Sequence, residues 1–205
     1  MRFALDYINL TPGMGVAPSS APAWTNLLLD TEDFTTGNWT ATATYDTDIA
    51  GVAPDSGDAQ RWECPITAGV KGLSQGYVGG AGNHVQSLLL RRAAGDTDTY
   101  VMRWNVLNAT TPANNRFIKF NWVNGSDPVV SETGPGATGI VADDGDGWWR
   151  LSIVVTDDNE GDTMTAEYQL DRNQWQGYKL LPWGAQAESG VGLVAPSAYQ
   201  ARGGS

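Results

Sequence analysis

Residues 145–155 read Gly-Asp-Gly-Trp-Trp-Arg-Leu-Ser-Ile-Val-Val, which is a turn followed by an alternating apolar run. The Asp-Gly pair supplies the positive φ angles that a tight hairpin needs. Beyond it, Leu151, Ile153 and Val155 occupy every second position, and a period of two is typical of a strand with one face on a core. The stretch therefore predicts the second strand of an antiparallel hairpin.

The same pattern recurs along the chain, with short β-type runs separated by clusters of Gly, Asn, Asp and Pro. We expect strands at residues 26–29, 39–45, 59–64, 71–77, 84–92, 99–107, 117–123, 139–141, 148–156, 163–170 and 178–187. Helical periodicity is nearly absent, and only residues 32–36 suggest a brief helical turn. The sequence predicts an all-β, antiparallel two-sheet β-sandwich, about ten strands in all.

A length of 205 residues favours one domain with short extensions. We expect an extended N-terminal attachment arm at 1–23, a jelly-roll sandwich at 24–200 and a flexible tail at 201–205. The prolines and glycines of the arm disfavour a helix. Its apolar residues could add a strand to the sheet edge of a partner, and a disordered leader is the alternative. The candidate partner-binding residues of the arm are Phe3, Leu5, Tyr7, Ile8 and Leu10.

The formal net charge of −11, with only three lysines, argues against nucleic acid as a partner. No apolar run is long enough to span a bilayer, and the first residues lack the pattern of a signal peptide, so we expect neither membrane insertion nor secretion. The single cysteine, Cys64, leaves no intrachain disulfide and suits assembly in a reducing cytoplasm. We interpret it as a buried packing residue.

Three motifs together resemble a known family. They are Thr25-Asn-Leu-Leu with Phe34 and Trp39 near the start, the Gly-Asp-Gly-Trp-Trp-Arg segment from Gly145, and Trp183-Gly-Ala-Gln-Ala-Glu-Ser-Gly followed by Tyr199. This chain resembles the carbohydrate-binding-module-like jelly-roll domains of tailed-phage and prophage structural proteins. It departs from the family pattern at Ala187, where a larger apolar residue is common, and around Tyr199.

The resemblance implies a non-enzymatic virion protein that is assembled in the cytoplasm of a bacterial host. The short arm and the absence of fibre repeats favour a capsid decoration protein, of the cement or head-fibre type. Its partners would be the major capsid protein or other virion proteins, and a homo-oligomer, for example a trimer, would raise avidity. The alternative is a tail-associated receptor-binding module or adhesin that binds host-surface glycan. A carbohydrate-binding module of a secreted hydrolase is a third, less favoured hypothesis.

Catalysis is poorly supported by the sequence, and an enzyme is the last of the hypotheses. The only histidine, His84, follows a Gly-rich loop and is interpreted as a surface or turn residue, and no cofactor motif is present. Most of the nine tryptophans are expected in the core, whereas Trp122 and Trp175 have polar neighbours. Those two are the candidate exposed contacts for glycan or partner, with burial as an equal alternative.

Acidic turns offer one candidate metal site. Asp143, Asp144 and Asp146 place three carboxylates in four residues between glycines, and calcium prefers oxygen ligands from such loops. The distal glutamate of a calcium loop is missing. Solvated turns are therefore the favoured interpretation, both here and for the second acidic loop at 157–162, and a structural calcium ion is the alternative.

Overall fold

The computed structural model describes residues 25–41, 44–49, 53–55, 58–63, 71–97, 99–157, 161–170 and 180–199. It contains twelve strands and one short 3-10 helix, whose bounds are as follows. The elements are β1 (Thr40–Ala41), β2 (Thr44–Ile49), β3 (Ala59–Glu63), β4 (Lys71–Val78), β5 (Gly82–Arg92), β6 (Tyr100–Asn108), η1 (Pro112–Asn114), β7 (Arg116–Trp122), β8 (Val129–Thr133), β9 (Ala137–Gly145), β10 (Trp148–Asp157), β11 (Thr163–Leu170) and β12 (Leu180–Gly190). No helix among the described residues could cross a membrane.

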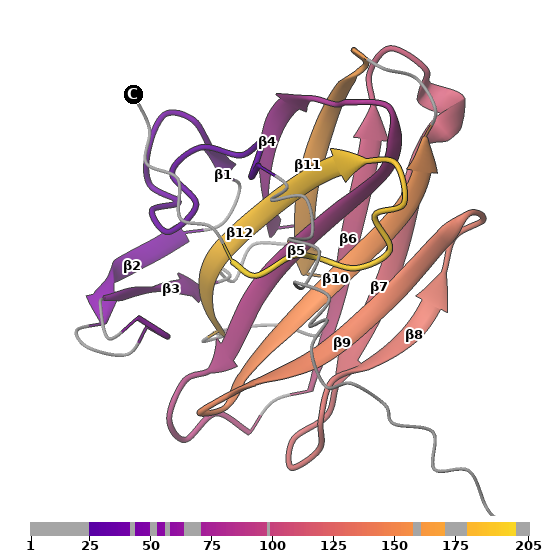
Figure 1. Ribbon diagram of the computed structural model, residues 1–205. Coiled ribbons are helices and arrows are strands. Elements are labelled where there is room, and N and C mark those ends of the chain that lie inside the picture. Colours follow the sequence, from indigo (N-terminus) through magenta and orange to yellow (C-terminus); the bar gives the residue numbers. More distant parts are fainter. Residues whose placement is uncertain are drawn as a thin grey trace, which may run out of the picture.

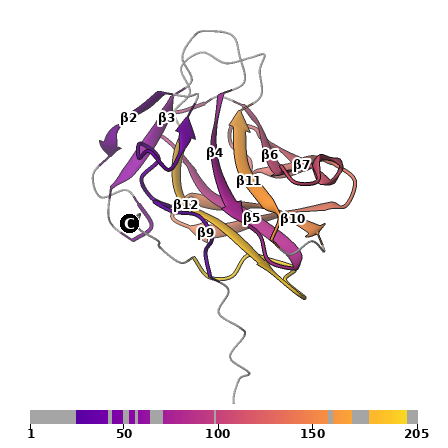
Figure 2. The ribbon, with the colours of Figure 1, turned by 90° about the horizontal axis from the view of Figure 1, so that it is seen from above.

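The strands form two antiparallel six-stranded sheets, which confirms the predicted β-sandwich. Sheet A has the order β1-β4-β11-β6-β7-β8, and sheet B has the order β2-β3-β12-β5-β10-β9. Figures 1 and 2 show them as two facing layers, and the chain crosses between layers repeatedly, as in a jelly roll. The quoted stretch becomes β10, and its preceding turn joins it to β9.

The core lies between the sheets and follows the period of two. On β6, for example, Tyr100, Met102, Trp104 and Val106 are buried and point inward. The Trp104 ring lies 5.2 Å from the Tyr168 ring centroid, and its indole Nε1 donates a hydrogen bond of 3.1 Å to the carbonyl oxygen of residue 151 on the opposite sheet. This buried indole ties the two sheets together, because its polar atom finds a partner across the core.

Three sequence predictions need correction. Residues 26–29 are not a strand, because the Asn26 side chain bonds the backbone of Ala185 and Ala187 in place of a regular ladder. Residues 32–36 form bends and turns rather than a helix. Strand β8 was missed, since all five of its residues are exposed at a sheet edge and carry no apolar alternation.

Candidate functional site

The outer face of sheet B is covered by the chain that follows β12. In Figure 1 this segment, residues 191–199, crosses in front of β5 and β10, and we call it the C-terminal strap. Leu193 of the strap packs with Val85 and Val154, and Tyr199 lies 4.5 Å from the Trp183 ring centroid. Polar bonds fix the strap as well. Buried Glu188 accepts hydrogen bonds from the backbone N–H and the hydroxyl of Ser197, and Arg150 donates to the Ser197 carbonyl oxygen.

The outer face of sheet A has a different character. Within the described part of the chain, both apolar clusters outside the main core belong to sheet B and its covering segments. The outward side chains of β11, β6, β7 and β8 are instead mainly polar, and we call this surface the open face. Its central residues are Arg103, Asn105, Phe117, Lys119, Glu132, Glu167 and Gln169.

Strand register brings these seven residues into two neighbouring rows. Gln169 faces Arg103, Arg103 faces Lys119, and Lys119 faces Glu132, so that one row crosses four strands. In the adjacent row Glu167 faces Asn105, and Asn105 faces Phe117. Adjacent strands lie about 4.8 Å apart, so each row extends over roughly 10–14 Å.

Direct contacts hold the centre of the open face in one arrangement. The guanidinium carbon of Arg103 lies 4.2 Å from the Phe117 ring centroid, and its Nε donates a 2.8 Å hydrogen bond to Asn105 Oδ1. Asn105 Nδ2 donates in turn to Glu167 Oε2 at 2.9 Å. Beside them, Lys119 Nζ lies 2.8 Å from Glu132 Oε2. Cation–π and amide contacts of this kind limit side-chain motion before any ligand arrives.

This surface can form a dense set of hydrogen bonds with a polyhydroxylated ligand. It offers guanidinium and amide donors, carboxylate and amide acceptors, and one aromatic ring within two adjacent rows. A sugar chain presents alternating hydroxyl donors and acceptors over a comparable length. The two rows extend across three or four strands, a span that suits an extended chain more than a compact small molecule.

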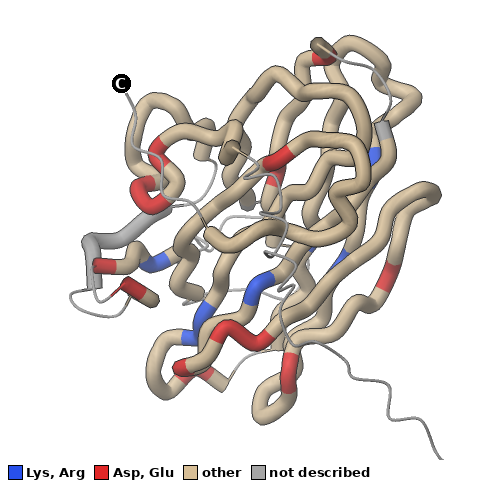
Figure 3. Tube along the Cα trace, in the orientation of Figure 1, with Lys and Arg blue, Asp and Glu red and all other residues tan. Residues whose placement is uncertain are grey.

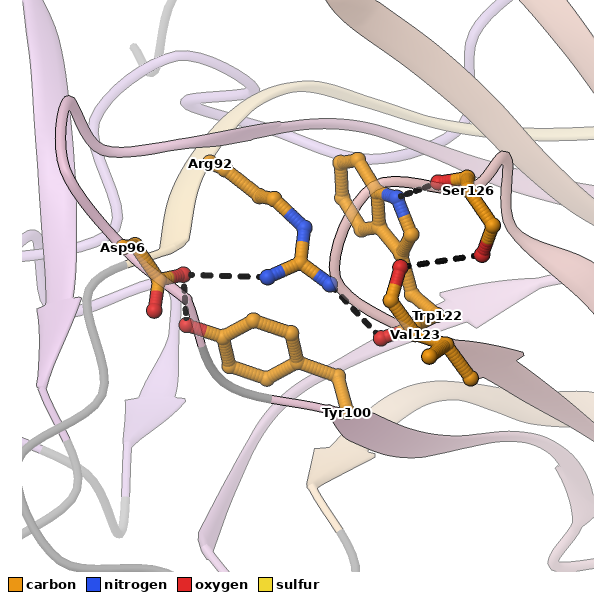
Figure 4. A network of polar contacts seen from close by, with 6 residues as sticks. All are labelled: Arg92, Asp96, Tyr100, Trp122, Val123 and Ser126. Atoms are coloured by element: carbon orange, nitrogen blue, oxygen red, sulfur yellow. Dashed lines mark hydrogen bonds and ion pairs between the residues drawn. The ribbon is translucent and has the colours of Figure 1, made fainter.

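Trp122 does not lie on this face, and its expected role as an exposed contact is corrected by the structure. Its side chain is only 3% exposed, and its indole Nε1 donates to the Ser126 carbonyl oxygen at 3.0 Å. The Arg92 guanidinium lies over the Trp122 ring, as Figure 4 shows, and also bonds Asp96. The polar Asn-Gly turn after Trp122 suggested an exposed side chain. In the structure, a carbonyl oxygen of this turn instead accepts the hydrogen bond of the buried indole.

In the acidic turn at the end of β9, two of the three aspartates contact other groups of the protein. Asp143 Oδ1 accepts a hydrogen bond from the Gly145 N–H, and Asp144 Oδ1 lies 3.8 Å from Arg150 Nη2. No group of three or more His, Cys, Asp or Glu suited to a metal ion occurs among the described residues, Asp146 included. Structural calcium stays a prediction from the sequence.

The remaining candidates divide between the core and the undescribed ranges. Trp39, Trp62, Trp148 and Trp183 are buried, as predicted. His84 is fully buried on β5, 6.2 Å from the Tyr77 ring, so its interpretation as a surface residue is wrong. Trp175 and the arm residues Phe3, Leu5, Tyr7, Ile8 and Leu10 lie outside the described residues.

Sequence reasoning did not single out the open face. Val101, Arg103 and Asn105 alternate in the sequence with the apolar residues of β6, and this alternation indicates a strand face that points away from the core. The sequence pattern does not reveal that β6 pairs with β7 and β11. This pairing places Phe117, Lys119 and Glu167 beside the outward residues of β6.

Solved structures with related architecture include carbohydrate-binding modules and a phage domain. The CBM22-1 xylan-binding domain of Paenibacillus barcinonensis Xyn10C is 15% identical, with a TM-score of 0.48 over 82% of this chain and 97% of that one. The CBM22-1–GH10 modules of Clostridium thermocellum Xyn10B, complexed with xylohexaose, are 10% identical, with a TM-score of 0.48 over 84% and 30%. The enzymatically active domain of bacteriophage CBA120 tailspike protein 4 is 9% identical, with a TM-score of 0.41 over 77% and 20%.

This chain thus spans less than a third of the length of the last two structures. No protein-family model matches the chain, and no curated protein matches it. The two-sheet architecture is established by the strand pairing of the chain itself.

Proposed function

We propose that this domain is a non-catalytic carbohydrate-binding module of a phage virion, and that the open face of sheet A binds glycan on the host surface. The observation that carries the proposal is the contrast between the two outer faces. The C-terminal strap and its apolar contacts cover sheet B, whereas sheet A presents Arg103, Phe117 and Glu167, with the buried amide of Asn105 joining Arg103 to Glu167.

Charge and residue type support a glycan over the other partner classes. The chain carries 23 acidic and 12 basic residues, and Figure 3 shows the described Lys and Arg scattered along the trace rather than gathered into one strip. Binding to a nucleic-acid backbone needs clustered cations. A hydrophobic protein interface needs a large apolar centre, and the centre of the open face is polar.

The virion assignment rests on the sequence motifs, among them Gly-Asp-Gly-Trp-Trp-Arg from Gly145 and the segment from Trp183. A tail-associated module fits a glycan-binding face best. Capsid decoration is the alternative position for the same domain, and it depends on the alternating apolar residues of segment 1–23. Cryo-electron microscopy of the particle distinguishes the two positions, because one places the domain on the capsid lattice and the other at the tail.

Glycan binding is tested by an array of bacterial and plant oligosaccharides probed with the purified domain. We expect a small set of positive glycans, and loss of that signal in Phe117→Ala and Glu167→Gln. The matched control is Thr138→Ala, an exposed change on β9 at the edge of sheet B, which should bind as the unmodified protein does. A flat array, or equal binding by all four proteins, would refute the open face as a glycan site.

A further inference from the structure

Arg103 presents an unusual donor group at the centre of the open face. Its Nε is engaged by Asn105 and its plane is stacked on Phe117. Among the described residues, no hydrogen bond or ion pair engages its terminal nitrogens Nη1 and Nη2. The guanidinium is therefore held in place while Nη1 and Nη2 have no partner among the described residues. Two parallel N–H donors of this kind match the two oxygens of a carboxylate.

A second cation lies directly beside it. Lys119 faces Arg103 across the β6–β7 ladder, and both side chains point outward. Like charges in directly opposed positions are unfavourable in a sheet. Two opposed cations are unexpected in a chain of net charge −11, and a bound anion would reduce the repulsion between them.

The neighbouring carboxylates do not neutralise this pair of cations completely. Glu167 is held by the amide of Asn105, which lies between Glu167 and the guanidinium. Glu132 pairs with Lys119 at the sheet edge, where its side chain is 50% exposed. Exposed pairs of this kind are weak, so Lys119 can contribute to an incoming anion as well.

We infer that the glycan bound by the open face carries a carboxylate, as in a uronic-acid-containing oligosaccharide, and that Arg103 is the residue that binds this carboxylate. The inference rests on the glycan-binding function proposed above. The carboxylate accepts two hydrogen bonds from Nη1 and Nη2, and Lys119 adds charge at the adjacent position. Gln169 and Glu167 Oε1, both on the adjacent strand β11, bond the hydroxyls of neighbouring sugar units, since Gln169 lies in the row of Arg103 and Glu167 in the row of Asn105.

Isothermal titration calorimetry with two matched oligosaccharides tests the inference by comparing their affinities. One ligand is a galacturonate oligosaccharide, and the other is the same oligosaccharide with its carboxylates methyl-esterified. We expect the acidic form to bind at least about tenfold more tightly, because a bidentate charge-assisted pair contributes more than a neutral one. Arg103→Gln should abolish that preference, and Arg103→Lys should retain only part of it, since a lysine keeps the charge but loses the fork.

The outcomes separate this inference from the proposed function. Equal affinity for both ligands, or a preference that survives in Arg103→Gln, would overturn the carboxylate assignment and leave glycan binding intact. Binding of neither ligand, together with a flat array, would overturn both. Thermal unfolding of each variant shows whether the domain is folded, and Lys119→Gln provides a second change whose expected effect is a smaller loss of the same preference.

Discussion

Arg92 donates a hydrogen bond of 2.7 Å to the carbonyl oxygen of Trp122, and its guanidinium carbon lies 4.8 Å from the Trp122 ring centroid. The Tyr100 ring centroid lies at the same distance from this carbon and 6.4 Å from the Trp122 centroid, and Asp96 supplies the counter-charge at 3.5 Å (Figure 4). This cluster joins β5 of sheet B to β6 and β7 of sheet A. It explains why a tryptophan with polar neighbours is a structural residue.

Replacing Arg92 should therefore destabilise the fold. Arg92→Ala leaves the Asp96 carboxylate, whose side chain is only 4% exposed, without its ion pair, and we expect a loss of about 3 kcal/mol in the free energy of unfolding. Arg92→Lys keeps the charge but loses the stacked plane, so its loss should be smaller. Urea denaturation measures both. The adjacent Arg91→Ala is the control, and a loss there as large as in Arg92→Ala would contradict the prediction.

Gly82 is required by a close approach as well as by its backbone conformation. Its φ is +101°, and a Cβ atom there would lie 2.7 Å from the backbone of Gly190 at the end of β12. Gly95 has a similar φ of +79° but no atom within 4 Å of such a Cβ. Gly95→Ala should therefore cost about 1 kcal/mol for left-handed strain alone.

Gly82→Ala should cost about 1–3 kcal/mol more than Gly95→Ala, because neither backbone segment can move without disturbing the ladder. Thermal unfolding of the two variants side by side gives the difference. Equal losses would show that the contact with Gly190 relaxes freely.

The stability of the domain should fall above pH 10 through Tyr168. Burial raises the pKa of this phenol well above its usual value, and nearby Tyr77 adds to the shift. Above pH 10 the unfolded chain loses this proton while the folded chain keeps it. The folded state then binds more protons, so stability decreases as pH rises, by up to about 1.4 kcal/mol per pH unit for one such group.

Tyr168→Phe should remove the part of the pH-dependent loss of stability that comes from this tyrosine. At pH 7 it loses the hydrogen bond of 3.1 Å to the Ser87 carbonyl oxygen, at a cost of about 1 kcal/mol. Between pH 10 and 11 the difference in the free energy of unfolding between Tyr168→Phe and the unmodified protein should become smaller. Ile153→Val, a core change of similar cost without a titrating group, should keep its deficit constant, and chemical denaturation across this pH range checks both. Parallel curves for the unmodified protein and Tyr168→Phe would contradict the prediction.

Asn105 should act on ligand affinity through the two side chains that it holds. Its amide bonds both Arg103 and Glu167, so Asn105→Ala frees both and we expect roughly tenfold weaker glycan binding from lost preorganisation. Titration with the array-selected glycan measures the loss. Asn105→Asp is the informative companion, because a carboxylate still accepts from Arg103 but repels Glu167. Unchanged affinity in both variants would show that Asn105 has no positioning role.

Much of the fold could be predicted from local pattern. Alternation in residues 148–155 and 100–106, together with Asn-Gly and Asp-Gly turns, predicted strands close to β10 and β6. Strand β8 could not be found in this way, since an edge strand with five exposed residues leaves no periodic signal. His84 was misplaced because residues 84–90 of β5 are buried on both faces of the strand, which a nearby Gly-rich turn does not indicate.

The sequence by itself determined most of the strands, their turns and, in strands such as β6, which residues face the core, because side chains alternate with a period of two whatever the partner strand. Only the tertiary structure decided which outer face is covered and which polar residues meet. Arg103, Phe117 and Glu167 come from three strands, and their contacts depend on the β11-β6-β7 order and register. That order is set by packing across the whole core, and no local stretch of sequence encodes it.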